Sequence, residues 1–156
     1  MSNQALPSEP KVHLELSLGQ AQDLNRALDV YVRIGIGQVE TIAELMRWDQ
    51  ITPAAAGVEM SLELLDGVER RLLELKALLG HARGASLGIG SPKSTLSVRR
   101  AYEMKKAMSK ALAEHREPSP AFKGVDYDGL FIRYTKDDPP VVTVVTCNED
   151  VEDKSQ

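Results

Sequence analysis

The sequence predicts an α+β fold, in which a small and mainly antiparallel sheet packs against three helices. Helical spacing of apolar residues dominates the middle of the chain, and alternating apolar and polar residues occur near both ends. The 156 residues are enough for one domain with its own core. We therefore expect a flexible arm at 1–10, a single α+β domain at 11–147 and an acidic tail at 148–156.

Alternation with a period of two predicts the strands of this sheet. The first is "KVHLEL" (11–16), close to the N-terminus. Near the C-terminus, "FKGVDY" and "LFIRYT" flank the pair Asp128-Gly129, which is a strong hairpin signal. A further strand, "VVTVVTC" (141–147), follows a break at two consecutive prolines.

Helix-start signals and apolar stripes predict the three helices. Ser17 and Gln20 form a capping box, and we expect one helix from Gln20 to about Arg47. Thr52 followed by a proline predicts the start of a second helix, which would end at Gly80. The third is expected at 97–116, where prolines follow. The stripe of the first helix consists of Leu24, Leu28, Tyr31, Gly35, Val39, Ile42 and Met46.

Two glycines interrupt the first predicted helix, although each costs about 1 kcal/mol relative to alanine in a helix interior. Gly35 falls on the apolar stripe, where it would let another helix approach closely. Gly37 shares a more polar face with Arg33, so its missing side chain would leave room beside a fixed positive charge. The pattern predicts close packing at Gly35 and open space beside Arg33 at Gly37.

Several functional classes lack support in the sequence. No run of roughly 18 apolar residues could span a membrane, and the N-terminus does not resemble a secretory signal. The single Cys147 suits a reducing cytoplasm. His13, His81 and His115 are scattered without metal-ligand spacing, and no nucleophile motif is present. We therefore expect a protein that is not an enzyme and that needs no metal or cofactor.

Charge is distributed unevenly along the chain, whose formal net charge is -4. Segment 97–116 contains six Lys or Arg and two Glu, a local charge of +4 that leaves -8 for the remainder. Just before it, the loop "GIGSPKST" (88–95) offers glycines, hydroxyls and a lysine ahead of a helix N-terminus, but it lacks the phosphate-loop signature. One interpretation is an anion site shared by Arg33, this loop and the basic helix. The other is that the basic helix simply has a solvated charged face and that the loop only connects two helices.

Three segments carry a resemblance to a family of small phage proteins: "ALDVYVRIGIGQVETIAELMR" (27–47), "ASLGIGSP" (85–92) and "RRAYEMKKAM" (99–108). Their order and spacing resemble those of the phage Thoeris anti-defence family, in the first type described. The resemblance implies a protein that binds and sequesters host immune signalling nucleotides without cleaving them. Glycocyclic ADP-ribose is the family's ligand, and some members also bind cyclic di- or trinucleotides. It also implies homo-oligomers, either dimers or trimers of dimers, in the host bacterial cytoplasm.

The same resemblance assigns ligand contacts by position. Arg33 matches an arginine that contacts ligand phosphate, and Arg116 falls near a second arginine. Leu87 and Ser97 depart from the family pattern, because they stand where a base-stacking aromatic ring and an asparagine are expected. Loss of a stacking ring costs about 1–3 kcal/mol per base. The complete expected ligand-binding set is Arg33, Gly37, Leu87, Gly88, Ser97, Arg100 and Arg116.

Other functions stay open at this point. A phage protein-interaction module would use the same helices to hold a protein, with no small-molecule ligand. A nucleic-acid binder would use the basic residues of 97–116 and show steep salt dependence, but the negative charge elsewhere disfavours it. We therefore expect no nucleic-acid and no membrane partner. A hydrolase that degrades the signal lacks a visible base, nucleophile or metal cluster.

Overall fold

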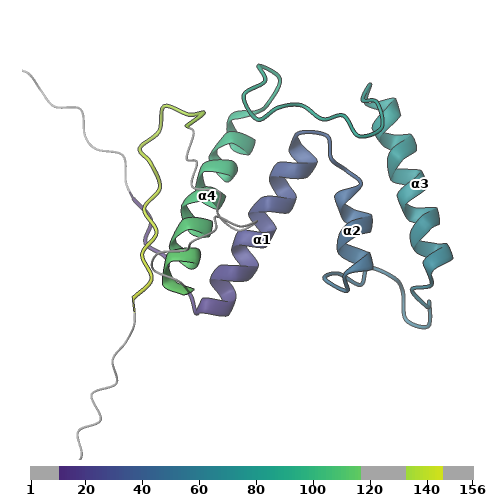
Figure 1. Ribbon diagram of the computed structural model, residues 1–156, viewed down its shortest axis with the longest axis horizontal. Helices are drawn as coiled ribbons and strands as arrows, with labels where there is room; N and C mark the ends of the chain where they lie inside the picture. The colour runs from purple at the N-terminus through teal and green to yellow at the C-terminus, as the bar shows by residue number, and fades with distance from the viewer. Residues whose placement is uncertain (1–10, 117–132, 146–156) are drawn as a thin grey trace, which may run out of the picture.

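The protein was analysed as a computed structural model, which describes residues 11–116 and 133–145. These residues form four helices, α1 (Leu18–Gly35), α2 (Thr41–Arg47), α3 (Leu62–Leu78) and α4 (Leu96–Arg116), and no strand. Helix α1 lies beside α4, and α2 lies beside α3 (Figure 1). The predicted α+β fold is therefore wrong for the described part of the chain, which is all-helical.

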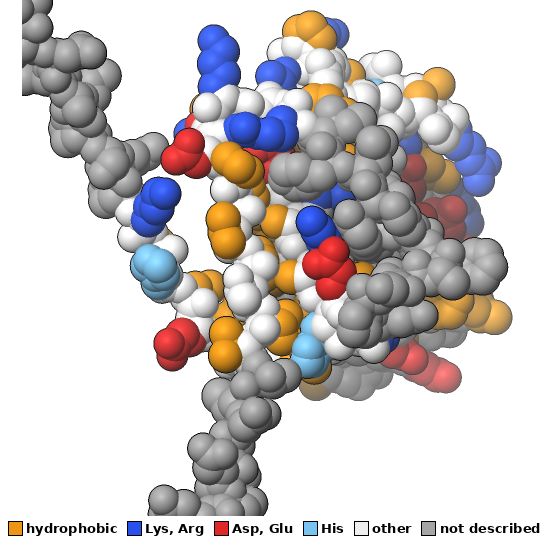
Figure 2. Space-filling view, turned by 60° about the vertical axis from the view of Figure 1, so that its left-hand side comes forward, with side chains coloured by type: hydrophobic (Ala, Val, Ile, Leu, Met, Phe, Trp, Pro, Cys, Tyr) orange, Lys and Arg blue, Asp and Glu red, His pale blue; other side chains and the backbone are white. Residues whose placement is uncertain are grey.

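The predicted strands do not form in the described residues. Alternation shows that a segment could lie in a sheet, but a stable strand also needs a second strand to pair with. Residues 11–16 and 141–145 form no ladder, and Val12 and Val145 are 94% and 77% exposed. Figure 2 shows hydrophobic side chains at the surface on the face that this view brings forward. Most of the predicted hairpin, the arm at 1–10, residues 146–147 and the tail at 148–156 lie outside the described residues.

The start of α1 confirms the predicted capping box. The Ser17 hydroxyl accepts the Gln20 N–H at 3.2 Å, and the Gln20 side chain accepts the Ser17 N–H at 2.9 Å. Two backbone donors that a helix start leaves without partners are thereby satisfied. Local side-chain chemistry fixed this boundary, and it was readable from the sequence.

Helix α1 ends at Gly35, two residues before Gly37, so the prediction of one helix from 20 to 47 is wrong. Gly37 has φ +91° and donates its N–H to Ile34 O at 3.0 Å, while Gln38 donates to Arg33 O at 2.8 Å. This pair of bonds is a Schellman motif, which favours glycine because its left-handed residue is strained for other side chains. The chain then turns and starts again at α2.

The second predicted helix begins later than expected. Helix α3 starts at Leu62, where the Ser61 hydroxyl accepts the Leu64 N–H at 3.2 Å, and not at Thr52. Gly57 has φ +84°, a conformation that does not continue a right-handed helix. The third predicted helix is confirmed by α4, whose bounds differ from 97–116 by a single residue.

Antiparallel packing of α1 on α4 forms a buried apolar cluster. Val32, Val98 and Ala101 are its buried centre, with Leu28, Ile36, Ile89 and Tyr102 packed against them. A Cβ added to Gly35 would overlap Cγ2 of Val98, so Gly35 lets α4 approach closely, as the sequence predicts. This contact holds the polar faces of α1 and α4 next to each other.

An ion pair joins α3 to the turn that precedes α2. The Lys76 side chain is only 1% exposed, and its Nζ contacts Oε1 of Glu40. Burial would raise the pKa of the Glu40 carboxyl, but the hydrogen bond from Lys76 and the nearby positive charges of Lys76 and His81 outweigh it and lower that pKa. Buried apolar side chains of the α2–α3 pair include Ala43, Met46 and Leu65.

Candidate functional site

A groove of about 580 Å³ runs between α1 and α4. Its size lies within the range of about 300–1,000 Å³ that is usual for small-molecule sites. It is lined by Leu18, Gln22, Asn25, Arg26, Asp29, Arg33, Lys105, Ser109, Leu112, Ala113, His115 and Arg116. All of these residues belong to the two helices, so a ligand in the groove would contact rigid elements.

Positive charge predominates in this groove. The described lining residues include four cations, Arg26, Arg33, Lys105 and Arg116, and one carboxylate, Asp29. Their formal charge is +3 with His115 neutral. The whole chain carries -4, so the groove has the opposite sign to the protein around it. Cations gathered in a cleft raise the local concentration of anions, and guanidinium groups bind phosphate oxygens in pairs.

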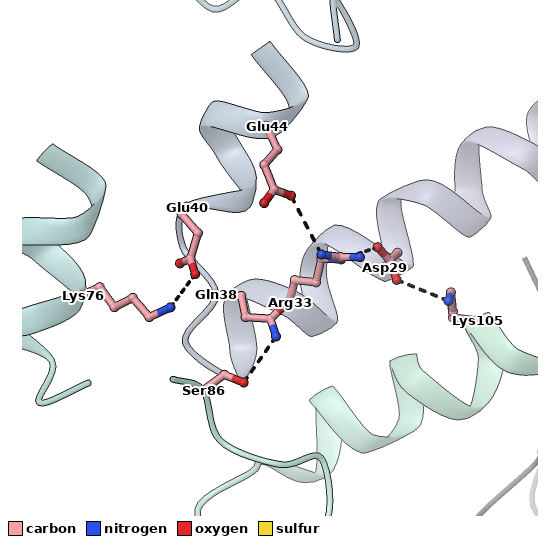
Figure 3. A network of polar contacts seen from close by, with 8 residues as sticks. All are labelled: Asp29, Arg33, Gln38, Glu40, Glu44, Lys76, Ser86 and Lys105. Atoms are coloured by element: carbon pink, nitrogen blue, oxygen red, sulfur yellow. Dashed lines mark hydrogen bonds and ion pairs between the residues drawn. The ribbon is translucent and has the colours of Figure 1, made fainter. Parts of the chain in front are cut away.

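Asp29 organises the centre of the groove. Its Oδ2 accepts a hydrogen bond from Nε of Arg33 at 2.7 Å, and its Oδ1 lies 3.3 Å from Nζ of Lys105 (Figure 3). On the side of α2, Glu44 Oε2 lies 3.9 Å from Nη1 of Arg33. Asp29 therefore fixes one cation from each helix, while the five N–H donors of Arg33 exceed what this carboxylate uses.

The polar base of the groove is a contact between α1 and α4. The Asn25 side-chain amide donates to the Ser109 hydroxyl at 3.1 Å, and that hydroxyl lies 3.2 Å from Oδ1 of the same asparagine. Ser109 is fully buried, so the contact satisfies a hydroxyl that would otherwise cost free energy. The bond also fixes how α1 and α4 face each other at the groove.

Two of the seven predicted ligand residues, Arg33 and Arg116, line this groove. They come from different helices and occupy different parts of it. Arg33 lies with Lys105 at Asp29, whereas Arg116 is eleven residues after Lys105, about 16 Å along the axis of α4. A ligand that touches both arginines would have to be as long as a nucleotide with its phosphates.

Gly37, Leu87 and Gly88 lie together at a different place, where α1 ends. The Leu87 N–H donates to Ile36 O at 2.8 Å, and the Gln38 side chain donates to the Ser86 hydroxyl at 3.3 Å (Figure 3). The space next to Gly37 is occupied, because a Cβ placed there would lie 2.6 Å from Nε2 of His81. None of these three predicted residues lines the groove.

Ser97 and Arg100 lie in the first turns of α4, outside the groove. Ser97 is exposed. Arg100 bonds Asp137 through Nε at 2.5 Å and through Nη2 at 3.3 Å. Hydrogen bonds from Arg100 lower the pKa of the Asp137 carboxyl. The structure thus shows Arg100 holding the segment after residue 132 against α4.

Sequence reasoning missed Arg26, Asp29, Lys105 and His115 as groove residues. A signal was present, because Arg26, Asp29 and Arg33 are spaced by three and four, which places them on one helix face. The same spacing connects the α4 residues Lys105, Ser109, Leu112 and Arg116. The spacing does not reveal which other helix each face contacts. Only the antiparallel packing of α1 and α4 shows that these two faces lie together.

Further properties of the described residues limit what the groove can do. Among residues 11–116 and 133–145, no three His, Cys, Asp or Glu side chains gather as metal ligands. No helix of that part is long and apolar enough to cross a bilayer. Among the described residues that line the groove, His115 carries the only ring, so within that part a base would stack on its imidazole or on a guanidinium plane.

Comparison of the chain with protein-family models, with curated proteins and with solved structures finds no match. The role of the groove therefore has to be inferred from its own residues.

Proposed function

We propose that the protein binds a phosphate-bearing signalling nucleotide in the groove between α1 and α4 and retains it without cleavage. The observation that carries this proposal is a cleft of nucleotide size whose described lining includes four Lys or Arg side chains and one carboxylate. Phosphates would take the guanidinium groups of Arg33 and Arg116, and the nucleoside would lie against Leu112 and Ala113.

The resemblance to the phage anti-defence family supplies the biological part of the proposal. The protein would act in the cytoplasm of a bacterial host, where it would keep glycocyclic ADP-ribose, or cyclic di- or trinucleotides, from the effector that they activate. It would do so as a homo-oligomer. In this function binding has to be tight, while chemistry on the ligand is not needed.

The test is retention of ligand by the purified full-length chain. The protein is incubated with glycocyclic ADP-ribose isomers and cyclic oligonucleotides, washed and denatured by heat, and the released molecules are identified by mass spectrometry. We expect one species to be released intact. If a folded protein retains none of them, the proposal is wrong; release of a cleaved product would contradict sequestration.

Charge-reversal variants locate the site. Arg33→Glu and Arg116→Glu should each weaken retention by about 10-fold or more, since a hydrogen bond to a charged group contributes about 1.5–3 kcal/mol. Arg83→Glu is the matched control, because Arg83 lies in the loop after α3 and does not line the groove. If all three variants retain the ligand equally well, the ligand does not bind in this groove.

A further inference from the structure

We infer that Asp29 selects the sugar of the ligand, because its carboxylate accepts hydrogen bonds from the two neighbouring hydroxyls of a ribose. The groove then takes ribonucleotides with a free vicinal diol in preference to nucleotides that lack one. This inference rests on the proposed function, since it requires a nucleotide in the groove between α1 and α4. It adds the class of sugar and the residue that recognises it.

A carboxylate is unexpected in a site that binds phosphate. Asp29 is the one acidic side chain among the described residues that line the groove, which also include four Lys or Arg. A phosphodiester or diphosphate at neutral pH is an anion with no proton to donate along its bridging oxygens, so Asp29 repels it. Phosphate binding alone therefore gives Asp29 no favourable contact with the ligand, whereas a neutral hydroxyl on the same ligand does.

Asp29 retains acceptor capacity on both of its carboxylate oxygens. Oδ2 accepts the Nε–H of Arg33 at 2.7 Å, and Oδ1 lies 3.3 Å from Nζ of Lys105 (Figure 3). An ionised carboxylate has about four acceptor positions, so these two contacts leave roughly one on each oxygen. The side chain of Asp29 is 33% exposed and lines the groove, so a ligand can reach it. Two hydroxyls on adjacent carbons match the two oxygens of one carboxylate.

The cations beside Asp29 favour a sugar at this position over a base. Arg33 and Lys105, which contact Asp29, are the groups that suit a phosphate. In a nucleotide the sugar is bonded directly to the phosphate, and the base is attached to the other side of the sugar. A ligand whose phosphate lies on Arg33 therefore presents its sugar to Asp29. Its base lies further along the groove, towards Leu112, which follows Lys105 by about 10 Å along the axis of α4.

The requirement for a diol separates the ligands named in the proposed function. A cyclic di- or trinucleotide with 3′–5′ linkages has one hydroxyl of each ribose esterified, so it offers Asp29 a single hydroxyl from any one sugar. A nucleotide that keeps both neighbouring hydroxyls of one ribose offers a pair. Asp29 therefore favours the second class of ligand.

The test compares ADP with 2′,3′-dideoxy-ADP, which differ only in the diol, by isothermal titration calorimetry on the full-length chain. The wild-type chain should bind ADP about 10-fold or more tightly, because the dideoxy probe loses hydrogen bonds to a charged acceptor. Asp29→Asn should remove most of this difference. The ratio of the two dissociation constants is the readout, since the added positive charge of the variant acts on both probes alike.

The matched control is Asp23→Asn, which makes the same charge change on α1. Asp23 is 79% exposed and does not line the groove, so this variant should keep the wild-type preference for ADP. Far-ultraviolet circular dichroism of both variants should equal that of the wild type, because both aspartates lie at least partly in solvent.

Three outcomes would overturn the inference. If Asp29→Asn weakens both probes equally, Asp29 only positions Arg33 and Lys105. If it tightens both equally, the carboxylate competes with phosphate for those cations. A wild-type chain that binds the two probes alike, or binds neither, does not select a diol. The proposed function fails by a different result, in which a folded chain retains no signalling nucleotide, so the two failures are distinguishable.

Discussion

Glu103 of α4 accepts two hydrogen bonds from Thr135, one from its N–H at 2.7 Å and one from its hydroxyl at 2.8 Å. The Tyr134 N–H adds a third bond at 2.6 Å, and the Tyr134 ring meets Tyr102 edge-on with ring centroids 5.5 Å apart. The buried Glu103 carboxylate thus accepts hydrogen bonds from the backbone N–H groups of Tyr134 and Thr135. In the predicted hairpin a neighbouring strand would have accepted such bonds.

Glu103→Gln should destabilise the fold by about 1.5–3 kcal/mol, the usual worth of a hydrogen bond to a charged group. Glu103 is 2% exposed, so water does not replace the lost interaction. Urea denaturation measures the change. Glu114→Gln is the matched control, because the exposed Glu114 is 4.0 Å from Lys110 and its loss should cost little. Equal effects of the two variants would contradict the role given to Glu103.

Stability should fall in acid. Burial would raise the pKa of the Glu103 carboxyl, but its bonds from Thr135 and Tyr134 outweigh burial and lower that pKa from the ordinary 4.5. The pKa of Glu40 is also lowered from 4.5. A lowered pKa in the folded state means that the unfolded chain binds more protons in acid. These contributions are complete above pH 4.5 and are lost as pH falls through the lowered values.

The measurement is the urea midpoint as a function of pH for the wild-type chain and for Glu103→Gln. The variant should lose less stability between neutral and acidic pH, because the proton uptake linked to Glu103 is gone. If the two curves run parallel over that range, Glu103 does not contribute to the acid response.

Gly37→Ala should destabilise the fold by more than the roughly 1–2 kcal/mol that a left-handed conformation costs an L-residue. The added Cβ would also lie 2.6 Å from Nε2 of His81. His81→Ala in the same chain should remove the clash and leave the backbone cost. Thermal unfolding of the two single variants and the double variant separates these terms. If the stability changes of the two single variants simply add in the double variant, the Cβ added at Gly37 does not clash with His81.

Lys76→Met should destabilise the fold by about 3 kcal/mol, because it leaves Glu40 partly buried without its counter-ion. Lys76→Met/Glu40→Leu should recover most of that loss, since an apolar pair needs no desolvation of charge. Urea denaturation of both variants checks the expectation. A double variant that is less stable than Lys76→Met would show that Glu40 has a further partner in the fold.

Particular residues show which features of the fold the sequence predicts correctly. Ser17 and Gln20 were sufficient to place the start of α1, because a capping box is completed within one turn. Gly35 predicted a close helix approach, and Val98 supplies it. The stripe through Gly35 and Val39 continued past Gly37 and concealed the end of α1, since apolar periodicity reports burial and does not report the sign of φ.

For the candidate site, the sequence supplied Arg33 and Arg116, but it could not show that they line one groove. It also grouped them with Gly37, Leu87, Gly88, Ser97 and Arg100, which the structure places elsewhere. Asp29 and Lys105 enter the site only through the packing of α1 on α4. Helical spacing identifies the residues that share one face of a helix. It does not identify the helix that packs against this face, because that helix lies far away in the sequence.

The sequence by itself determined the local features: the cap at Ser17, the extent of α4 and the opposite signs of charge along the chain. These depend on interactions within a few residues. The tertiary structure alone decided that residues 11–16 and 141–145 form no sheet, and that the basic faces of α1 and α4 meet around Asp29. Strand pairing and groove formation depend on contacts between distant segments, whose free energy no local pattern contains.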